Sequence, residues 1–158
     1  MNVLVFILEM IGTVAFAVSG AVVALKKRMD IFGVAVLGVT TAVGGGVMRD
    51  LLLGKTPPAM FTDPVYALVA VVVSLVVFLP FVRRCVLSNN RAYELMLLIS
   101  DSAGLGAFAA VGTQAVMDSA YSDNLLLAVF LGTITGVGGG LTRDIIAGEL
   151  PYIFRKHV

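Results

Sequence analysis

The stretch Val43-Gly44-Gly45-Gly46-Val47-Met48-Arg49-Asp50 occurs a second time in the chain, as Val137-Gly138-Gly139-Gly140-Leu141-Thr142-Arg143-Asp144. Aligning the surrounding blocks, Gly38–Gly54 with Gly132–Gly148, gives nine identities in seventeen positions. Pro57 and Pro151, three residues beyond the blocks, also match. A duplicated block of this kind indicates an internal repeat, and the rest of the chain is interpreted from it.

The composition is that of a membrane protein. Of the 158 residues 59% are hydrophobic and only 13% are charged, and the mean hydropathy is +1.01. A soluble domain carries about 25% charged residues. The apolar runs Leu4–Leu25, Pro64–Val82 and Tyr93–Met117 are each long enough to cross a bilayer core of about 30 Å at about 1.5 Å per residue. We therefore predict an all-α integral membrane protein.

We predict five transmembrane helices in a single membrane domain, residues 1–158. They span Leu4–Leu25, Ile31–Leu53, Pro64–Val82, Ala92–Met117 and Asn124–Ile146, with a linker at Arg83–Arg91. Residues 1–84 form a first repeat of three helices, and residues 92–158 form a second, incomplete repeat of two. The fourth helix repeats the pattern of the first, because Asp101, Gly104, Phe108 and Gly112 correspond to Glu9, Gly12, Phe16 and Gly20.

Basic residues predict the orientation. They follow the first, third and fifth helices, as Lys26, Lys27 and Arg28, then Arg83, Arg84 and Arg91, then Arg155 and Lys156. The positive-inside rule places these segments in the cytoplasm and the N-terminus outside. A repeat of three spans makes the second copy inverted, so a pseudo-two-fold axis lies in the membrane plane, as in many transport proteins. Both glycine triplets then lie near the midplane, with Arg49-Asp50 towards the outer face and Arg143-Asp144 towards the inner face.

Several function classes are excluded. A net charge of +1 without a long basic run indicates no nucleic-acid partner. Cys85 is the only cysteine and His157 the only histidine, so neither a disulfide nor a metal site is expected. Gly136–Gly140 lies inside a predicted membrane helix and does not follow a strand, as a dinucleotide-binding loop would. The sequence contains no enzymatic motif, and we expect no enzyme and no cofactor.

The glycine triplets have two interpretations. Each glycine weakens a helix by about 1 kcal/mol relative to alanine. Either the triplets Gly44–Gly46 and Gly138–Gly140 kink or unwind their helices and turn carbonyls towards a polar path, or they let another backbone pack closely. Their duplication at matched depth, each followed by Arg-Asp, favours the polar path.

The remaining polar candidates also allow more than one role. Arg49 with Asp50 and Arg143 with Asp144 either pair structurally or act as mouth and gating charges. The hydroxyls preceding the glycines either line a pore or bond back to their own helix; they belong to Thr40, Thr41, Thr133 and Thr135. Weaker candidates are the intramembrane polar residues Glu9, Asp101, Ser19 and Ser102.

At the duplicated Gly-Gly-Gly-x-x-Arg-Asp block the sequence resembles the prokaryotic branch of the trimeric intracellular cation (TRIC) channel family, whose bacterial group is also labelled glycine transporter domain proteins. The resemblance covers nearly the whole chain. It implies a homotrimer with a pore in each protomer, lined by the two glycine-kinked helices. It also implies permeation of potassium and sodium ions. We further expect membrane lipid, bound lipid included, as a partner.

The family pattern is two three-helix repeats plus a seventh helix. The sequence stops soon after the fifth predicted helix, so we expect it to lack the counterpart of the third helix and the seventh helix. Val158 is not the natural end that we expect for an inverted repeat.

The predicted function is a monovalent cation channel in a bacterial or archaeal plasma membrane. Its carbonyls and hydroxyls would replace part of the hydration shell of the ion. The alternative is a secondary transporter of glycine or another small zwitterion, whose carboxylate would meet the N-terminal dipole of a broken helix. A purely structural membrane scaffold leaves the duplicated motif unexplained.

Overall fold

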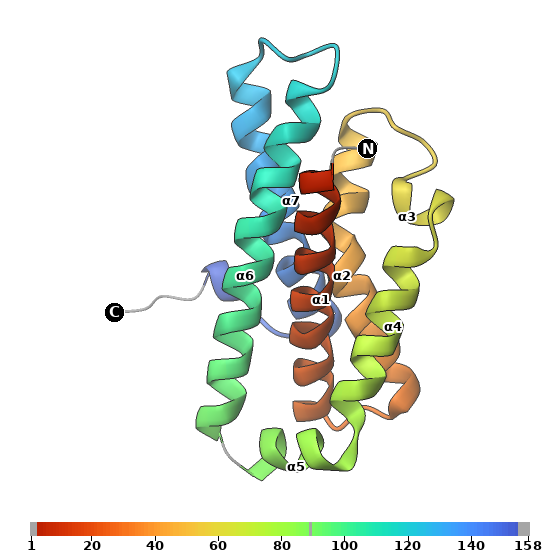
Figure 1. Ribbon diagram of the computed structural model, residues 1–158. Coiled ribbons are helices and arrows are strands. Elements are labelled where there is room, and N and C mark those ends of the chain that lie inside the picture. The colour runs from red at the N-terminus through yellow and green to blue at the C-terminus, as the bar shows by residue number, and fades with distance from the viewer. Residues whose placement is uncertain (1–2, 89, 155–158) are drawn as a thin grey trace.

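The computed structural model describes residues 3–88 and 90–154, and every regular element in these ranges is helical (Figure 1). The elements in chain order are α1 (Val3–Lys26), α2 (Ile31–Leu52), α3 (Ala59–Thr62), α4 (Val65–Phe78), α5 (Pro80–Ser88), α6 (Asn90–Met117), α7 (Leu125–Ile146) and the 3-10 turn η1 (Tyr152–Phe154). The predicted basic residues Arg155 and Lys156, together with His157 and Val158, lie outside the described residues.

The helices confirm an all-helical membrane protein. Among the described residues, α1, α2, α6 and α7 are each long and apolar enough to cross a bilayer, and α4 with α5 counts as a fifth span if the bent pair is taken as one. Many large apolar side chains lie exposed on the outside of the bundle. Such a surface is an aggregation hazard in water but suits contact with lipid.

The duplicated block gives α2 and α7 the same ends. Asp30 caps α2 by accepting a hydrogen bond from the Gly33 amide, and Asn124 caps α7 in the same way. Each helix is followed by a glycine with positive φ, Gly54 at 71° and Gly148 at 68°. Glycine adopts this left-handed conformation without steric cost, so the matched last glycine of each block terminates a helix.

The third predicted helix, Pro64–Val82, is wrong at its C-terminal end. α4 stops at Phe78, and Leu79 takes an extended conformation, with φ −55° and ψ 145°. Leu79 precedes Pro80, and a residue before proline is disfavoured in the helical region. The chain then bends by 67° into α5, which occupies most of the predicted linker Arg83–Arg91. Proline is well tolerated in the first turn of a helix, so Pro80 both ends α4 and begins α5.

The four long helices form two pairs, and the two helices of each pair run antiparallel to one another. α1 runs antiparallel to α6, and α2 antiparallel to α7, while α5 crosses one end of the bundle (Figure 1). α1 is the central helix, with Ala17, Ala21 and Val22 fully buried. Its second half packs with α2, α4, α5 and α6 in the main hydrophobic cluster. This arrangement is the expected inverted order of the repeated helices.

Candidate functional site

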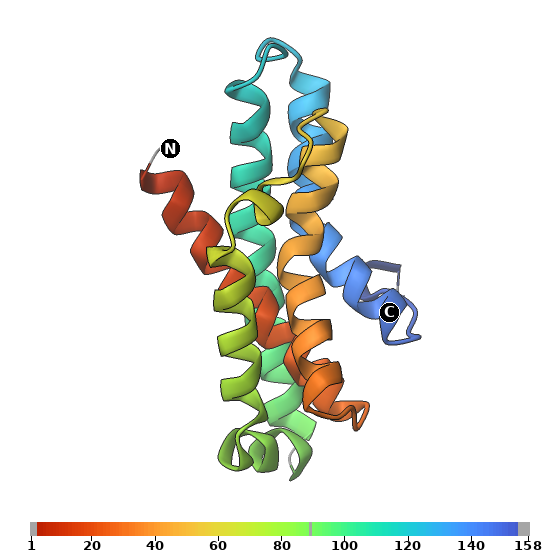
Figure 2. The same ribbon diagram turned by 90° about the vertical axis from the view of Figure 1, so that its right-hand side faces the viewer.

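The glycine triplets lie where α2 and α7 cross, and the structure corrects one expectation about them. Both helices are continuous through the triplets, so the glycines do not unwind them. α7 bends along its length without a break (Figure 2). A Cβ placed on Gly45 would lie 2.1 Å from the Thr135 carbonyl oxygen, and one on Gly139 would lie 2.5 Å from the Thr41 carbonyl oxygen. These reciprocal contacts require glycine, because no side chain fits between the two backbones.

The other glycines of the triplets differ in their surroundings, because some contact the opposite helix and others face open space. A Cβ on Gly138 would lie 3.0 Å from Gly45 Cα, so Gly138 is also part of the crossing. A Cβ on Gly46 or Gly140 would meet nothing closer than a guanidinium nitrogen, Arg49 Nη2 at 4.0 Å and Arg143 Nη2 at 3.8 Å. The third glycine of each triplet therefore leaves space beside the arginine that follows it.

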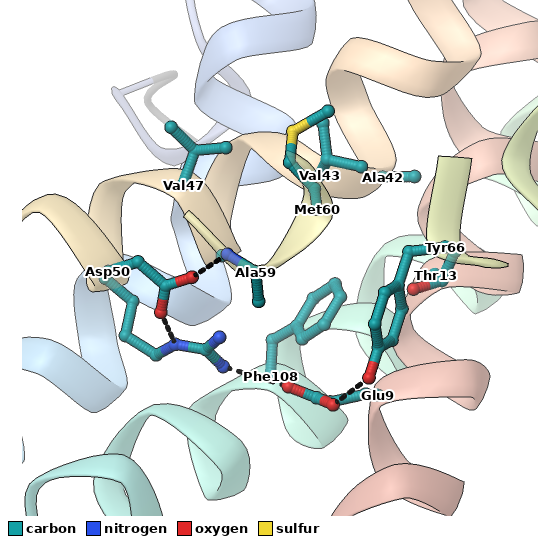
Figure 3. Close-up of a pocket in the computed structure, with 12 residues that line it drawn as sticks. Glu9, Thr13, Ala42, Val43, Val47, Asp50, Ala59, Met60, Tyr66 and Phe108 are labelled. Atoms are coloured by element: carbon teal, nitrogen blue, oxygen red, sulfur yellow. Dashed lines mark hydrogen bonds and ion pairs between the residues drawn. The ribbon is translucent and has the colours of Figure 1, made fainter. Parts of the chain in front are cut away.

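Arg49 is the centre of a charged cluster near the N-terminal end of α1. It donates from Nε to Asp50 Oδ1 at 2.9 Å and from Nη1 to Glu9 Oε1 at 3.2 Å. Tyr66 donates its hydroxyl to Glu9 Oε2 at 2.6 Å, and the Ala59 amide donates to Asp50 Oδ2 at 2.9 Å (Figure 3). One cation and two carboxylates from α1 and α2 are thus joined to the start of α3 and α4.

Arg143 is the centre of a matching cluster in the second repeat. Its Nε and Nη2 contact Asp144 Oδ1, both at 2.8 Å, and its Nη1 lies 2.6 Å from Asp101 Oδ1. Nη1 also donates to Ser19 Oγ, which donates in turn to Asp101 Oδ1 at 2.6 Å. The side chain of Arg143 is 2% exposed. The equivalent positions of the two repeats therefore make equivalent ion pairs, with Ser19 added only here.

Each cluster lines a pocket. The N-terminal pocket, of about 40 Å³, is lined by Glu9, Thr13, Ala42, Val43, Gly46, Val47, Arg49, Asp50, Ala59, Met60, Tyr66 and Phe108. The C-terminal pocket, of about 250 Å³, is lined by Phe16, Leu98, Asp101, Ser102, Leu105, Gly136, Val137, Gly140, Leu141, Arg143, Asp144, Pro151 and Ile153. Most positions of the first lining have repeat equivalents in the second. Because the repeats are antiparallel, the first pocket lies beside the first half of α1 and the end of α2, and the second lies beside the middle of α6 and the end of α7.

The charges give both pockets the same sign. Each holds one arginine and two carboxylates, which is one formal negative charge when all three groups are ionised. Buried charges of one sign attract the opposite ion strongly because the surroundings are apolar. Every buried side-chain nitrogen and oxygen of the described residues has a hydrogen-bond partner. Among those residues no group of three or more His, Cys, Asp or Glu side chains is placed to hold a metal ion.

The predicted polar residues separate into two groups. The two Arg-Asp pairs come together with Glu9, Asp101 and Ser19, and Ser102 lies at the exposed edge of the C-terminal pocket. The four threonines line neither pocket: each donates to a carbonyl of its own helix, as Thr41 to Leu37 at 2.6 Å. Pore lining by Thr40, Thr41, Thr133 and Thr135 stays a prediction.

Sequence reasoning missed two features of the pockets. Tyr66 is one of them, and its signal is a tyrosine near the start of an apolar run, whose polar tip needs a partner. Phe16 and Phe108 appeared only as matched positions of the repeats. Their rings stack across the centre of the bundle, 5.5 Å apart between centroids, and each lines one pocket. Nothing in the spacing alone shows that they meet.

The sequence profile of the glycine transporter family matches residues 6–81 and 98–158. The UPF0126 inner membrane protein YadS of Escherichia coli is 42% identical over 155 residues, which cover 98% of this chain and 72% of YadS.

Two solved structures are similar over nearly all of the chain. The TRIC trimeric intracellular cation channel orthologue from Rhodobacter sphaeroides superposes with a TM-score of 0.86 at 35% identity, covering 97% of this chain and 75% of that one. A second structure, described as the structural basis for conductance through TRIC cation channels, superposes with a TM-score of 0.78 at 44% identity. The match covers 95% of this chain and 70% of that one.

These proteins are described as a transporter family, a membrane protein and cation channels, which agrees with the expectation that the chain is not an enzyme. The chain belongs to the glycine transporter (UPF0126) family and has the fold of the prokaryotic TRIC channels.

Proposed function

We propose that the protein is a channel for monovalent cations, passing potassium and also sodium. The path in each protomer runs from the N-terminal pocket, past the crossing of α2 and α7, to the C-terminal pocket. The observation that supports the proposal is the pair of repeat-related pockets, each with a net negative cluster, that adjoin the same central phenylalanine stack. α1 and α6 line this path as well as α2 and α7, because Glu9, Phe16, Asp101 and Phe108 come from them.

The charge balance favours cations over anions. An anion entering either pocket meets two carboxylates for each arginine, whereas a cation is attracted by their excess. The arginines stay paired, so they reduce the depth of the attraction without reversing its sign. Conduction requires binding that is favourable enough for entry and weak enough for exit, and this partial neutralisation suits it.

The relatives support the assembly and the location of the protein. The Rhodobacter sphaeroides protein is named as a trimeric cation channel, and YadS as an inner membrane protein. We extend both to this chain: a homotrimer with a pore in each protomer, in the plasma membrane, with lipid around its apolar outer faces. The positive-inside rule orients α5, with Arg83 and Arg84, towards the cytoplasm.

A secondary transporter of glycine or another small zwitterion is the second candidate. The description of the family favours it, and so does the separation of the two pockets, which alternating access requires. The uninterrupted α2 and α7 count against it, because the N-terminal dipole of a broken helix is what would bind the substrate carboxylate in such a transporter.

The test is recording from the purified protein in planar bilayers with asymmetric potassium and sodium chloride, followed by addition of glycine. A channel gives discrete current steps that reverse near the equilibrium potential of the cation and do not respond to glycine. A silent bilayer, together with proteoliposomes that accumulate labelled glycine, would overturn the channel in favour of the transporter.

A further inference from the structure

The two pockets are separated at the centre of the bundle by a pair of phenylalanines. Phe16 of α1 and Phe108 of α6 stack with their ring planes 24° apart. Phe108 lines the N-terminal pocket, whose other lining residues belong to α1–α4, and Phe16 lines the C-terminal pocket, whose other lining residues belong to α6, α7 and the segment after it. The labelled Phe108 ring lies beside Glu9 and Tyr66 in the pocket (Figure 3).

Matched glycines fix the position of both rings. A Cβ on Gly12 would lie 3.0 Å from three atoms of the Phe108 ring, and a Cβ on Gly104 would lie 2.8 Å from the Phe16 ring. Gly139, at the crossing of α2 and α7, packs on the other side of Phe16 at 2.9 Å by the same measure. Phe16 is 2% exposed and Phe108 is 4% exposed. Each ring therefore packs tightly against a glycine, and a side chain at either glycine would displace the ring.

The central layer offers little to replace the hydration shell of an ion. On one side are the two aromatic rings, and on the other are the backbones of α2 and α7 in direct contact at Gly45 and Gly139. The nearby Thr41 and Thr135 hydroxyls already donate to their own helices. An ion that loses water without gaining polar partners meets a large free-energy barrier, and an apolar constriction can close a pore by excluding water.

We propose that the Phe16–Phe108 stack is the hydrophobic gate of the permeation path. The path is closed when the rings stack and opens when they separate, which leaves the charged clusters on either side intact. This inference rests on the proposed function, because a gate needs a permeation path. It assigns the barrier to two apolar rings and not to the Arg49 or Arg143 clusters.

Single-channel recording of ring variants tests the gate. Phe16→Leu and Phe108→Leu, alone and together, remove the stack while keeping bulky apolar side chains in the core. Loss of the stacking interaction is expected to raise the open probability about two- to tenfold, the factor that corresponds to the extra stabilisation of an aromatic pair. Phe130→Leu is the matched control, since Phe130 lies on α7 with 51% of its surface exposed. Open probabilities equal to that of the wild type would overturn the gate.

A second measurement reports the barrier without any current. In a Cys85→Ser background, Val43→Cys places a thiol in the N-terminal pocket and Val137→Cys places one in the C-terminal pocket. A membrane-impermeant thiol reagent should modify each from one side of the membrane only. Adding Phe16→Ala and Phe108→Ala should make both thiols reactive from both sides. Unchanged one-sided reactivity in folded protein would contradict a barrier made by the rings.

The two measurements separate the two hypotheses. If the wild type conducts and the leucine variants do not differ from it, the channel stands and the gate fails. If no variant conducts but thiol access becomes two-sided, the rings are the barrier of an occluded path and the channel itself fails.

Discussion

Replacing Gly45 by alanine tests the closeness of the α2–α7 crossing. The new Cβ would lie 2.1 Å from the Thr135 carbonyl oxygen, a contact that side chains essentially never make, and the obstructing atom is backbone. The two helices must therefore move apart by about 1 Å, a displacement of the kind that overpacking forces on a core. Overpacking costs about 1–3 kcal/mol, with this backbone contact at the upper end, and the better helix propensity of alanine offsets about 1 kcal/mol.

The expected net destabilisation of Gly45→Ala is about 2 kcal/mol, from the overpacking cost less the propensity gain. For a chain of this size it corresponds to a fall in Tm of about 4–8 °C. Thermal unfolding in detergent, followed by far-ultraviolet circular dichroism, measures it. Gly139→Ala, at 2.5 Å from the Thr41 carbonyl oxygen, should behave alike. Gly106→Ala is the control, because nothing lies within 4 Å of its Cβ, and it should keep or raise the Tm. If the Tm of Gly45→Ala equals the Tm of Gly106→Ala, the close crossing is refuted.

Three further predictions concern the charged clusters and the orientation. Arg143→Gln leaves two carboxylates facing each other, and breaking a buried ion pair costs about 3–5 kcal/mol; a detergent-solubilised variant should lose roughly 10 °C in Tm, and an unchanged Tm would contradict the pairing. Tyr66→Phe removes a hydrogen bond to the Glu9 carboxylate worth about 1.5–3 kcal/mol, so its Tm should fall while that of the exposed-site variant Tyr121→Phe does not. Cys85, exposed on α5, should react with an impermeant maleimide in inside-out vesicles and not in intact cells; the reverse would invert the proposed orientation.

Much of the fold could be predicted because hydropathy and the repeat acted together. The ends of the long helices α1, α2, α6 and α7 were predicted within two residues, since their caps and flanking charges are local sequence features. The bend at Leu79 was not, because apolar residues continue through Pro80 to Val82 and hydropathy alone reads this as one span. Proline was the available signal, and the extended conformation of the preceding residue is its direct consequence.

The candidate site was predicted in its charges and not in its contacts. The Arg-Asp pairs, Glu9 and Asp101 were recognisable because a charge inside an apolar helix needs a partner. Weak helix propensity favoured kinking or unwinding at the glycines over close packing, and the continuous helices exclude only the unwinding. Intrahelical hydrogen bonds and the close contact of α2 with α7 outweigh that weakness, and sequence spacing does not reveal which backbone will approach Gly45. The partnership of Phe16 with Phe108 depends on the same three-dimensional crossing.

Each pocket takes one wall from the other half of the chain. Phe108 completes the pocket whose charges lie on α1 and α2, while Phe16 and Ser19 complete the surroundings of Arg143. A chain severed between α5 and α6 would therefore yield two fragments, neither of which encloses a finished pocket. The pockets would return only by complementation, with both fragments inserted into one membrane from opposite faces. Each half of the chain therefore supplies side chains to both pockets, although each carries its own copy of the motif.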